Sequence, residues 1–366
     1  MTLSVDEKIE IGLTDNKILL FRFDANLRKE IYQRLNDLQK RLLNRLSVIG
    51  TESVSQKALK QLLSEIAELV DDTYQDIHQS TSTDLNGLIA LQADVLANIY
   101  NDAVQFDLFN HVPDYRIKAI KGADLIAGTP LEEWWKKQGE DLTFRFNGIV
   151  RGGVLDGRSY NDLVNSVKDL MGKSRRGAET LVRTAVMKAN DVAHEALRNE
   201  NEDILKGEQH ISTLDTRTSE VCRIRDGLAW DLHHKPIGGH KVPYQRPPIH
   251  PNCRSDLKLL LKSWKELGIK ADEIPESTRA SMDGQVKSSM TYEDWLKTKS
   301  IEQQDEILGK GKAQLWRDGV ITFRDMLDQT GRPLTLKALS EVYQTRAVKL
   351  RPSGRRYKAI AHNILK

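Results

Sequence analysis

The residues best suited to chemistry in this 366-residue chain lie between 214 and 254. The chain has two cysteines, Cys222 and Cys253, and His250 precedes the second of them with the spacing H-x-x-C. An imidazole and a thiolate at this spacing can bind one metal ion, and Cys222 can join them as a third ligand. Because zinc prefers sulfur and nitrogen donors, the pattern indicates a candidate zinc site.

A tetrahedral zinc site needs a fourth ligand, which these three residues do not supply. Asp215, Asp226 or His240 could complete the site, or a water molecule could take the position. In a reducing compartment, two cysteines are expected to be free or metal-bound rather than joined by a disulfide. A site with only two cysteines is weaker evidence for zinc than paired C-x-x-C motifs.

A structural interpretation of the same stretch stays open beside the metal site. Asp226-Gly227 fits a tight turn, and the prolines around His250 stiffen the segment that presents it. On this interpretation, charged residues form buried polar links that hold the turns together, because buried charges must be paired. The residues assigned to this structural motif are Asp215, Arg217, Thr218, Asp226, Gly227, Pro248, Asn252 and Arg254.

Catalytic alternatives find less support in the sequence. His233, His234, His240 and His250 crowd into one loop-rich stretch, which raises a metal-dependent nuclease or a DNA-binding protein as the alternative hypothesis. However, no general base, phosphate-binding group and open metal position fall at a recognised nuclease spacing. An ADP-ribosylating toxin domain would need catalytic sequence after residue 260, where the pattern is only helical. No nucleophile elbow or phosphate-binding loop is present, so we expect no enzyme activity.

The elements that must position this stretch are mostly helices. Apolar residues at steps of three and four predict helices over 27–49, 59–77 and 88–99, with Gly50 ending the first and a polar joint at 79–84. Short joints favour antiparallel neighbours, so these helices should form a bundle or hairpin array. Between 111 and 157 the period weakens, and we interpret this stretch as a connector.

Further along the chain, helix and strand patterns alternate. Ser159 predicts a helix start and Gly172 its end, and a second helix is expected from a cap at Ser174. After Gly207 the sequence predicts short strands and loops, with a return to helix over 257–264. Three pairs spaced like capping boxes predict later helix starts, namely Thr291 with Asp294, Ser300 with Gln303, and Thr322 with Asp325.

These elements predict a predominantly helical α+β fold in three regions. Residues 1–150 would form a helical docking region, 151–265 an α+β core with the Cys/His motif, and 266–366 a small helical module. The chain ends in a basic tail, which is the best candidate to contact DNA or an acidic protein surface. The basic residues of this tail are Arg351, Arg355, Arg356, Lys358 and Lys366.

Composition bounds the functions that the chain can serve. Apolar residues make up 39% and charged residues 29%, which is typical of a globular chain. The net charge of +3, from 55 basic and 52 acidic residues, gives no global attraction to nucleic acid or to an anionic membrane. No apolar stretch approaches the roughly 20 residues that span a bilayer, and the N-terminal segment carries Asp6, Glu7 and Glu10 instead of a basic signal region. We therefore expect folding in a cytoplasm and no membrane span.

Two segments carry a resemblance to a known family. The chain contains LDTRTSEVC at 214–222, then DG at 226–227, and PPIHPNCR at 247–254. Together these resemble the signature of the phage Mu protein F-like head-morphogenesis proteins. The preceding helix, with Arg183-Thr184, resembles the family's Arg-Thr helix, although Ala185 replaces an expected acidic residue. The chain departs again at Ser219, where many members carry the first cysteine of a C-x-x-C pair.

The resemblance implies a non-enzymatic minor head protein, present in few copies near the portal vertex of a phage procapsid. It would act in head assembly and in DNA packaging or ejection. The implied partners are the portal protein and the major capsid or scaffold proteins. The implied location is the host cytoplasm during assembly and then the virion, inside the capsid.

Overall fold

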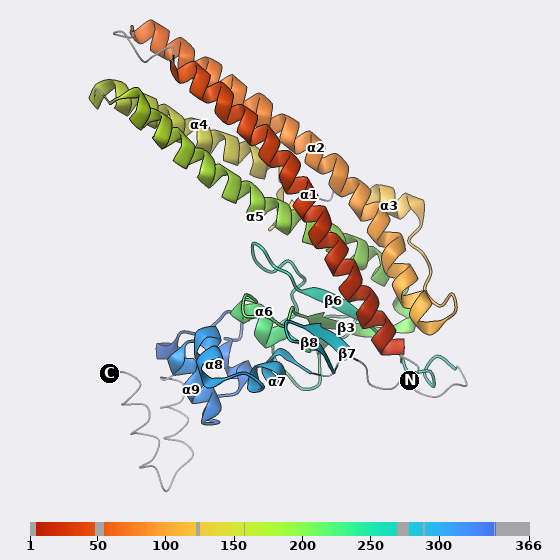
Figure 1. Cartoon of the computed structure of the whole chain (residues 1–366). Helices are drawn as coiled ribbons and strands as arrows, with labels where there is room; N and C mark the ends of the chain where they lie inside the picture. The colour runs from red at the N-terminus through yellow and green to blue at the C-terminus, as the bar shows by residue number, and fades with distance from the viewer. Residues whose placement is uncertain are drawn as a thin grey trace, which may run out of the picture.

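The structure, a computed structural model, describes residues 5–47, 55–121, 125–156, 158–268, 278–287, 290–339 and 341. Long helices form a bundle, and a small sheet with short helices lies at one end of it (Figure 1). The prediction of a predominantly helical α+β fold is confirmed. None of the described helices is both long enough and apolar enough to cross a bilayer.

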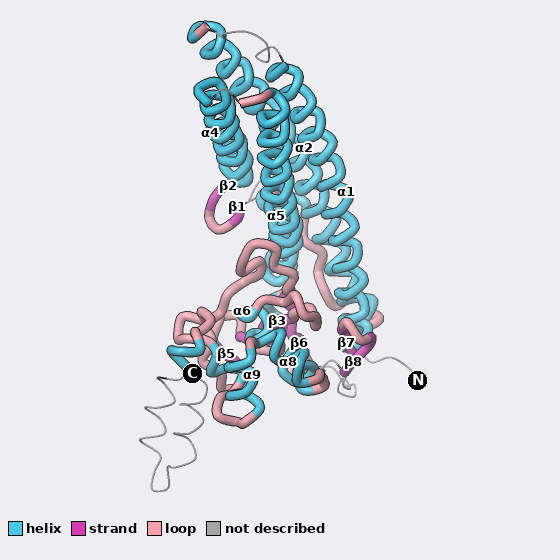
Figure 2. The backbone as a smooth tube through the Cα atoms, turned by 60° about the vertical axis from the view of Figure 1, so that its left-hand side comes forward, coloured by secondary structure: helices cyan, strands magenta, loops and turns pink. Residues whose placement is uncertain are grey.

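The bundle consists of α1 (Val5–Ser47), α2 (Gln56–Val104), α4 (Leu131–Asp156) and α5 (Tyr160–Glu200). α1 starts beside the sheet and runs away from it, α2 returns, α4 runs away again, and α5 leads back to the sheet (Figure 1). Between α2 and α4 lie the short α3 (Asp114–Ile120) and a hairpin of β1 (Leu125–Ile126) and β2 (Thr129–Pro130). Figure 2 shows this hairpin beside α4 and α5.

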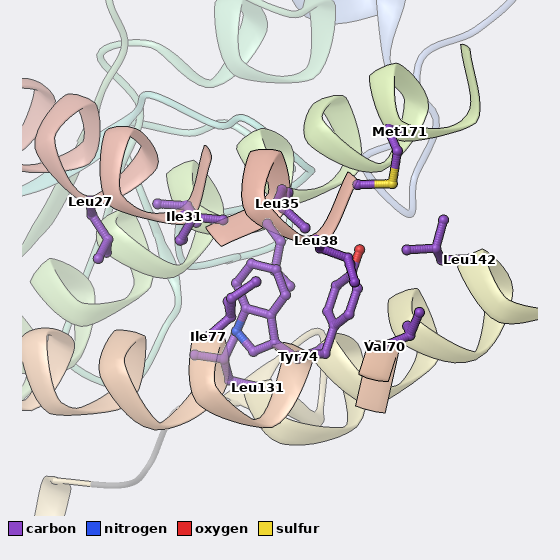
Figure 3. Packing of buried hydrophobic residues seen from close by; sticks show 14 of the residues in the cluster. Leu27, Ile31, Leu35, Leu38, Val70, Tyr74, Ile77, Leu131, Leu142 and Met171 are labelled. Atoms are coloured by element: carbon purple, nitrogen blue, oxygen red, sulfur yellow. The ribbon is translucent and has the colours of Figure 1, made fainter. Parts of the chain in front are cut away.

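The core of the bundle follows from the apolar stripes of its helices. Each stripe faces the bundle axis, and burying one large apolar side chain stabilises the fold by roughly 1.5–3 kcal/mol. Figure 3 shows side chains from all of these helices meeting in one cluster. The labelled members are Leu27, Ile31, Leu35, Leu38, Val70, Tyr74, Ile77, Leu131, Leu142 and Met171.

The predicted joint at 79–84 is wrong, because α2 runs through it without a break. Thr81 is fully buried, and the Thr83 hydroxyl donates to the Gln79 carbonyl at 2.9 Å inside the helix. The Thr83 hydroxyl is therefore satisfied within the helix, and the serine and threonine run does not turn the chain. Gly50 lies outside the described residues, and α1 ends at Ser47.

The interpretation of 111–157 as a connector is wrong, because α4 occupies most of it. The glycines of α4 obscure its apolar periodicity in the sequence. Two of them allow other parts of the chain to pack closely against this helix. A Cβ on Gly139 would lie 3.3 Å from the Tyr74 ring, and one on Gly153 would clash with Leu163 at 2.3 Å. Small residues here let neighbouring helices approach one another.

The expected break at Gly172 is also wrong, because α5 is one helix from Tyr160 to Glu200. Ser159 caps its start as predicted, accepting a hydrogen bond from the Asp162 N–H at 3.2 Å. Ser174 is not a cap, since its hydroxyl donates to the Leu170 carbonyl within the helix. α5 contacts α1 and α2 along the bundle and carries its last turns to the sheet.

The sheet is antiparallel, with the order β5-β4-β3-β6. Its strands are β3 (Leu205–Ile211), β4 (Ala229–Trp230), β5 (Pro236–Ile237) and β6 (Asp256–Leu261). The predicted return to helix at 257–264 is wrong, because β6 pairs along the whole of β3. The run of leucines in β6 is covered by the bundle, so burial rather than alternation sets its pattern.

Contacts at the base of the bundle fix the sheet beneath it. The buried Lys258 ammonium on β6 pairs with Glu10 of α1 at 3.0 Å, and the Leu259 N–H donates to the Tyr100 hydroxyl at 2.9 Å. A second hairpin, β7 (Thr278–Ser281) with β8 (Gly284–Lys287), lies near α1. The short 3-10 helix η1 (Glu202–Ile204) joins α5 to β3.

The remaining helices surround the sheet from the side away from the bundle. They are α6 (Glu220–Arg225), α7 (Tyr292–Lys297), α8 (Ile301–Leu308), α9 (Lys310–Arg317) and the 3-10 helix η2 (Phe323–Met326). All three predicted capping boxes are confirmed, at Thr291, Ser300 and Thr322. Trp230 of β4 and Trp295 of α7 belong to one buried cluster, so these helices share a core with the sheet.

Two predicted features are left open by this arrangement. The region boundaries near 150 and 265 remain predictions, because α5 packs into the bundle and the later helices pack onto the sheet. The basic tail from Arg351 to Lys366 lies outside the described residues.

Candidate metal centre

Three side chains from two separate segments of the chain meet at the edge of the sheet. Cys222 comes from α6, while His250 and Cys253 come from the loop that leads into β6. The Cys222 Sγ lies 3.7 Å from the Cys253 Sγ and 3.2 Å from the His250 Nε2, and all three donor atoms lie within 4.8 Å of one another. Both cysteines are buried and His250 is half-buried.

The loop that carries His250 and Cys253 is held by a tight turn. Asn252 adopts a left-handed φ of 60°, and the Cys253 N–H donates to the His250 carbonyl at 3.1 Å. The Asn252 N–H donates to the Thr184 hydroxyl of α5 at 3.1 Å, which ties the turn to the bundle. Asparagine tolerates this conformation better than most residues, which gives a physical reason for its place in the motif.

The histidine ring is oriented for binding. Its Nδ1 lies 2.8 Å from the Pro251 carbonyl, so Nδ1 carries the proton and donates to that oxygen. The lone pair of Nε2 then points toward the sulfurs. A backbone partner on the second ring nitrogen is the usual arrangement of a metal-binding histidine.

The separation of the two sulfurs fits a tetrahedral metal ion. Two sulfurs bound at about 2.3 Å with tetrahedral angles would lie about 3.8 Å apart. The observed separation of 3.7 Å between the two Sγ atoms agrees with this value. The donor set of two thiolates and one imidazole suits zinc better than the oxygen-seeking ions. The prediction that Cys222, His250 and Cys253 come together is therefore matched by a group that could hold a metal ion.

Without metal, the group concentrates negative charge on one sulfur. The hydrogen bond from Cys222 lowers the pKa of Cys253 to about 3, against the opposing effect of burial and with help from His250. The same hydrogen bond, together with burial, raises the pKa of Cys222. Its hydrogen bond to Cys253 raises the pKa of His250. A metal ion would displace the protons that remain, because thiolates and neutral imidazole are the binding forms.

None of the three predicted fourth ligands lies in this group. Asp215 binds Arg254 through both carboxylate oxygens, at 2.6 and 2.8 Å. The Asp226 carboxylate accepts from two backbone N–H groups, and the His240 Nε2 lies 2.8 Å from the Ala229 carbonyl. Ser219 lies closest instead, with its Oγ 2.6 Å from the His250 Nε2.

Asp215, Asp226 and Arg254 of the structural motif form polar links, whereas the Arg217 side chain is exposed. Asp226 accepts from the N–H of Ser212 and from that of Tyr292, both at 2.7 Å, and so joins β3 to α7. Asp215 also accepts from the Thr218 hydroxyl and the Arg217 N–H. Burial opposes the charge of Asp215, but Arg254 holds its pKa below the usual range.

Gly227 follows Asp226 with a left-handed φ of 76°, as a tight turn requires. Pro248 precedes the His250 turn and, like His250, lines a groove against α5. The candidate metal ligands and the polar links therefore lie in one compact module, and neither arrangement excludes the other.

A second buried polar cluster was not predicted. Arg246 pairs with Asp191 of α5 at 2.8 Å and with Glu208 of β3 at 3.1 Å, and the Tyr244 hydroxyl donates to Glu208 at 2.7 Å. Burial alone would raise the pKa of Glu208, but Arg246 lowers it below the usual range. These residues are widely spaced in sequence, and no local motif marks them.

The histidines that suggested a nuclease do not converge. His234 stacks on Tyr244 with ring centroids 3.9 Å apart, and His240 packs edge-on against Trp230. Among the described residues, the one group of His, Cys, Asp and Glu found with metal-binding geometry is Cys222, His250 and Cys253. The described residues therefore offer no observation that favours the nuclease hypothesis.

Two grooves border the centre. One, of about 1050 Å³, runs between α5, the β1–β2 hairpin and the loop 246–251. The other, of about 740 Å³, lies between Ser219, His250 and the segment 330–333. His250 lines both, so the histidine side of the centre is open to the surface while the cysteine side is closed.

Comparison with known proteins places this site in a family. Residues 146–258 match the model of the family described as Phage Mu protein F like protein. The match covers α5, most of the sheet and the three candidate ligands, and it supports the family suggested by the two sequence segments. It supports a role in phage head morphogenesis. Searches of curated proteins and of solved structures returned no match.

Proposed function

We propose that this chain is a minor protein of a bacteriophage head, present in few copies near the portal vertex, where it acts in assembly and in DNA packaging or ejection. The observation that carries the proposal is the family match over 146–258, which coincides with the module that holds the candidate metal centre. The proposal assigns no reaction to the chain. Its location would be the host cytoplasm during assembly and the virion afterwards.

The bundle is the part proposed to dock on the portal protein or on the major capsid or scaffold proteins. On α4, Phe144 and Leu155 are 79% and 85% exposed, unusually high values for large apolar side chains. Gly148 and Gly152 lie between them on the same side of the helix, and a Cβ at either would meet nothing within 4 Å. These four residues form the outer α4 face, which a helix of a partner could approach closely.

The position of this face suits a docking role. α4 runs toward the end of the bundle that is farthest from the sheet (Figure 1). A partner bound there would contact the bundle and would leave the sheet, with the candidate metal centre, uncovered. The basic tail is proposed as a separate contact with DNA, because clustered Lys and Arg neutralise phosphates.

The metal centre is proposed to bind zinc in a structural role. Cys222 and Cys253 would hold the ion from the closed side and His250 from the open side. Zinc would then link α6 to the loop before β6. Structural zinc contributes directly to folding, so the ion would stabilise the module rather than act on a substrate.

Removing the gene from the phage genome and complementing it with variants tests the proposal. We expect loss of the gene to give unfilled or aberrant heads in electron micrographs, and the wild-type gene to restore infectious particles. Normal heads and normal titre without the gene would contradict the proposal.

A docking variant sharpens this test. Replacing both Phe144 and Leu155 by Asp should leave the fold intact, because both side chains are exposed, but should keep the protein out of the particle. The matched control is Ile301→Asp on α8, where an apolar side chain is 59% exposed outside the bundle. Normal incorporation of the α4 variant would show that this face is not the docking surface.

A further inference from the structure

The candidate metal centre has three protein ligands, and a serine lies beside them. Ser219 lies at the start of α6, with its Oγ 2.6 Å from the His250 Nε2. Two donor atoms bound to one tetrahedral ion at about 2.0–2.1 Å would lie about 3.3 Å apart. The Ser219 hydroxyl is thus too near the His250 Nε2 for both atoms to bind one ion. It lies instead at hydrogen-bonding distance from the Nε2 lone pair, which a metal ion would occupy.

Serine is also chemically unsuited to close the site. The side chains that usually bind zinc are thiolates, imidazoles and carboxylates, whereas a serine hydroxyl keeps its proton at neutral pH. The nearby carboxylates are committed elsewhere, Asp215 to Arg254 and Asp226 to two backbone N–H groups. The described part of the chain therefore provides three ligands and no fourth.

The unfilled side of the centre faces a groove. Cys222 and Cys253 are 2% and 1% exposed, so they close the inner side. Ser219 and His250 both line the groove of about 740 Å³, together with Tyr244 and Arg332. An ion held by the three ligands would have its remaining position directed to this groove, because the sulfurs occupy the opposite side.

We propose that the bound ion keeps an exchangeable fourth position, filled by water and open through this groove to a small monodentate donor such as azide or imidazole. The inference rests on the proposed metal centre. A zinc site with three protein ligands leaves one position open to exchange, whereas four protein ligands close the site. Two thiolates neutralise a divalent ion, and Arg332 on the groove wall favours an anionic ligand.

Cobalt substitution of the full-length protein tests this proposal, because Co²⁺ absorbs visible light in a way that reports its ligands. We expect the wild-type protein to bind Co²⁺ with sulfur-to-metal absorption, and azide or imidazole to shift the visible bands in a saturable manner. Ser219→Cys should supply the missing ligand, raise the sulfur-to-metal absorption by about half as thiolates increase from two to three, and abolish the response to azide.

A second variant controls for disturbance of the fold. Ser219→Ala removes the hydroxyl without adding a ligand, so it should keep the wild-type response to azide. Tight Co²⁺ binding by the wild-type protein with bands that azide and imidazole leave unchanged would overturn the open position and leave the metal centre standing. Absence of Co²⁺ binding would overturn the metal centre itself and this inference with it.

Discussion

The bundle and the sheet module hold together in different ways. In the bundle, the buried cluster consists of apolar side chains repeated along long helices, and most ion pairs lie at the surface. In the module, fully buried residues include charged groups such as Glu208 and Arg225, and strands of two to seven residues are joined by turns. The bundle thus depends on many similar contacts, whereas the module depends on a few specific ones.

This difference predicts how each part responds to damage. Loss of one contact among many should weaken the bundle by the energy of that contact alone. Loss of a polar link or of the metal should affect the whole module, because a buried group left without its partner costs more than the contact was worth. The following predictions test this contrast.

The largest effect is expected from removing the metal. Chelation of the zinc-loaded protein should destabilise the module by several kcal/mol, because metal binding and folding of such sites are coupled. In a background that carries Trp134→Phe and Trp135→Phe, which removes the tryptophans of the bundle, fluorescence of Trp230 and Trp295 in the module core reports unfolding of the module, while circular dichroism reports the helices of the bundle. Cys253→Ser should reproduce the effect of chelation. Identical fluorescence melting with and without metal would refute a structural role for the ion.

The next largest effect is expected from Asp226→Ala. It would leave the N–H groups of Ser212 and Tyr292 without their carboxylate partner in the core, at a cost of about 3–5 kcal/mol. Urea unfolding followed by tryptophan fluorescence measures it. The control Asp72→Ala, on an exposed position of α2, should change stability by less than about 0.5 kcal/mol. A cost below about 1 kcal/mol for Asp226→Ala would mean that the link is not essential.

A comparable but more local effect is expected in the bundle. Leu35 is fully buried, and Leu35→Ala should cost about 3 kcal/mol through lost burial and the cavity left behind. The loss should appear in helix unfolding followed by circular dichroism, with little change in metal affinity. Leu91→Ala, at a position that is 57% exposed, is the control and should be nearly neutral. A parallel loss of metal binding in Leu35→Ala would show that the two parts are not independent.

The smallest effect concerns pH at the junction of the two parts. Burial lowers the pKa of His194, which lies 3.7 Å from Glu208, and Arg246 adds to this lowering. Since the unfolded chain takes up a proton below about pH 6.5 and the folded one does not, stability should fall as the pH drops below 6.5. One such group changes the free energy of unfolding by at most about 1.4 kcal/mol per pH unit.

The variant His194→Gln should therefore flatten the acid side of the stability curve between pH 5 and 6.5. Burial also lowers the pKa of His210 to about 4, so the variant should reduce the slope and not abolish it. Denaturant unfolding at a series of pH values measures this slope. An unchanged slope in the variant would show that His194 is not the group that titrates.

Sequence patterns predicted the parts of the fold that depend on local chemistry. The caps at Ser159, Thr291 and Ser300 were found because each hydroxyl bonds to a backbone N–H three residues later. The apolar stripes of α1 and α2 were also predictable, because residues that share one face of a helix lie three or four positions apart in sequence. The breaks at 79–84 and Gly172 were wrong because packing against other helices outweighs local preference.

The candidate site likewise has a part that local sequence predicts and a part that only the folded chain shows. The H-x-x-C spacing indicated that His250 and Cys253 belong together, and Cys222, the other cysteine of the chain, was the expected third ligand. The partners of Asp215, Asp226 and His240 were not predictable, because each depends on which backbone groups the fold leaves nearby. The Arg246 cluster joins residues more than 35 positions apart, so only the folded chain reveals it.

The most direct test of the account is to count this chain in purified phage particles by quantitative mass spectrometry, relative to the portal and major capsid proteins. A minor head protein at one vertex should be present in a few copies per particle, in a fixed ratio to the portal protein. Complete absence from mature particles, or a copy number close to that of the major capsid protein, would contradict the proposed role.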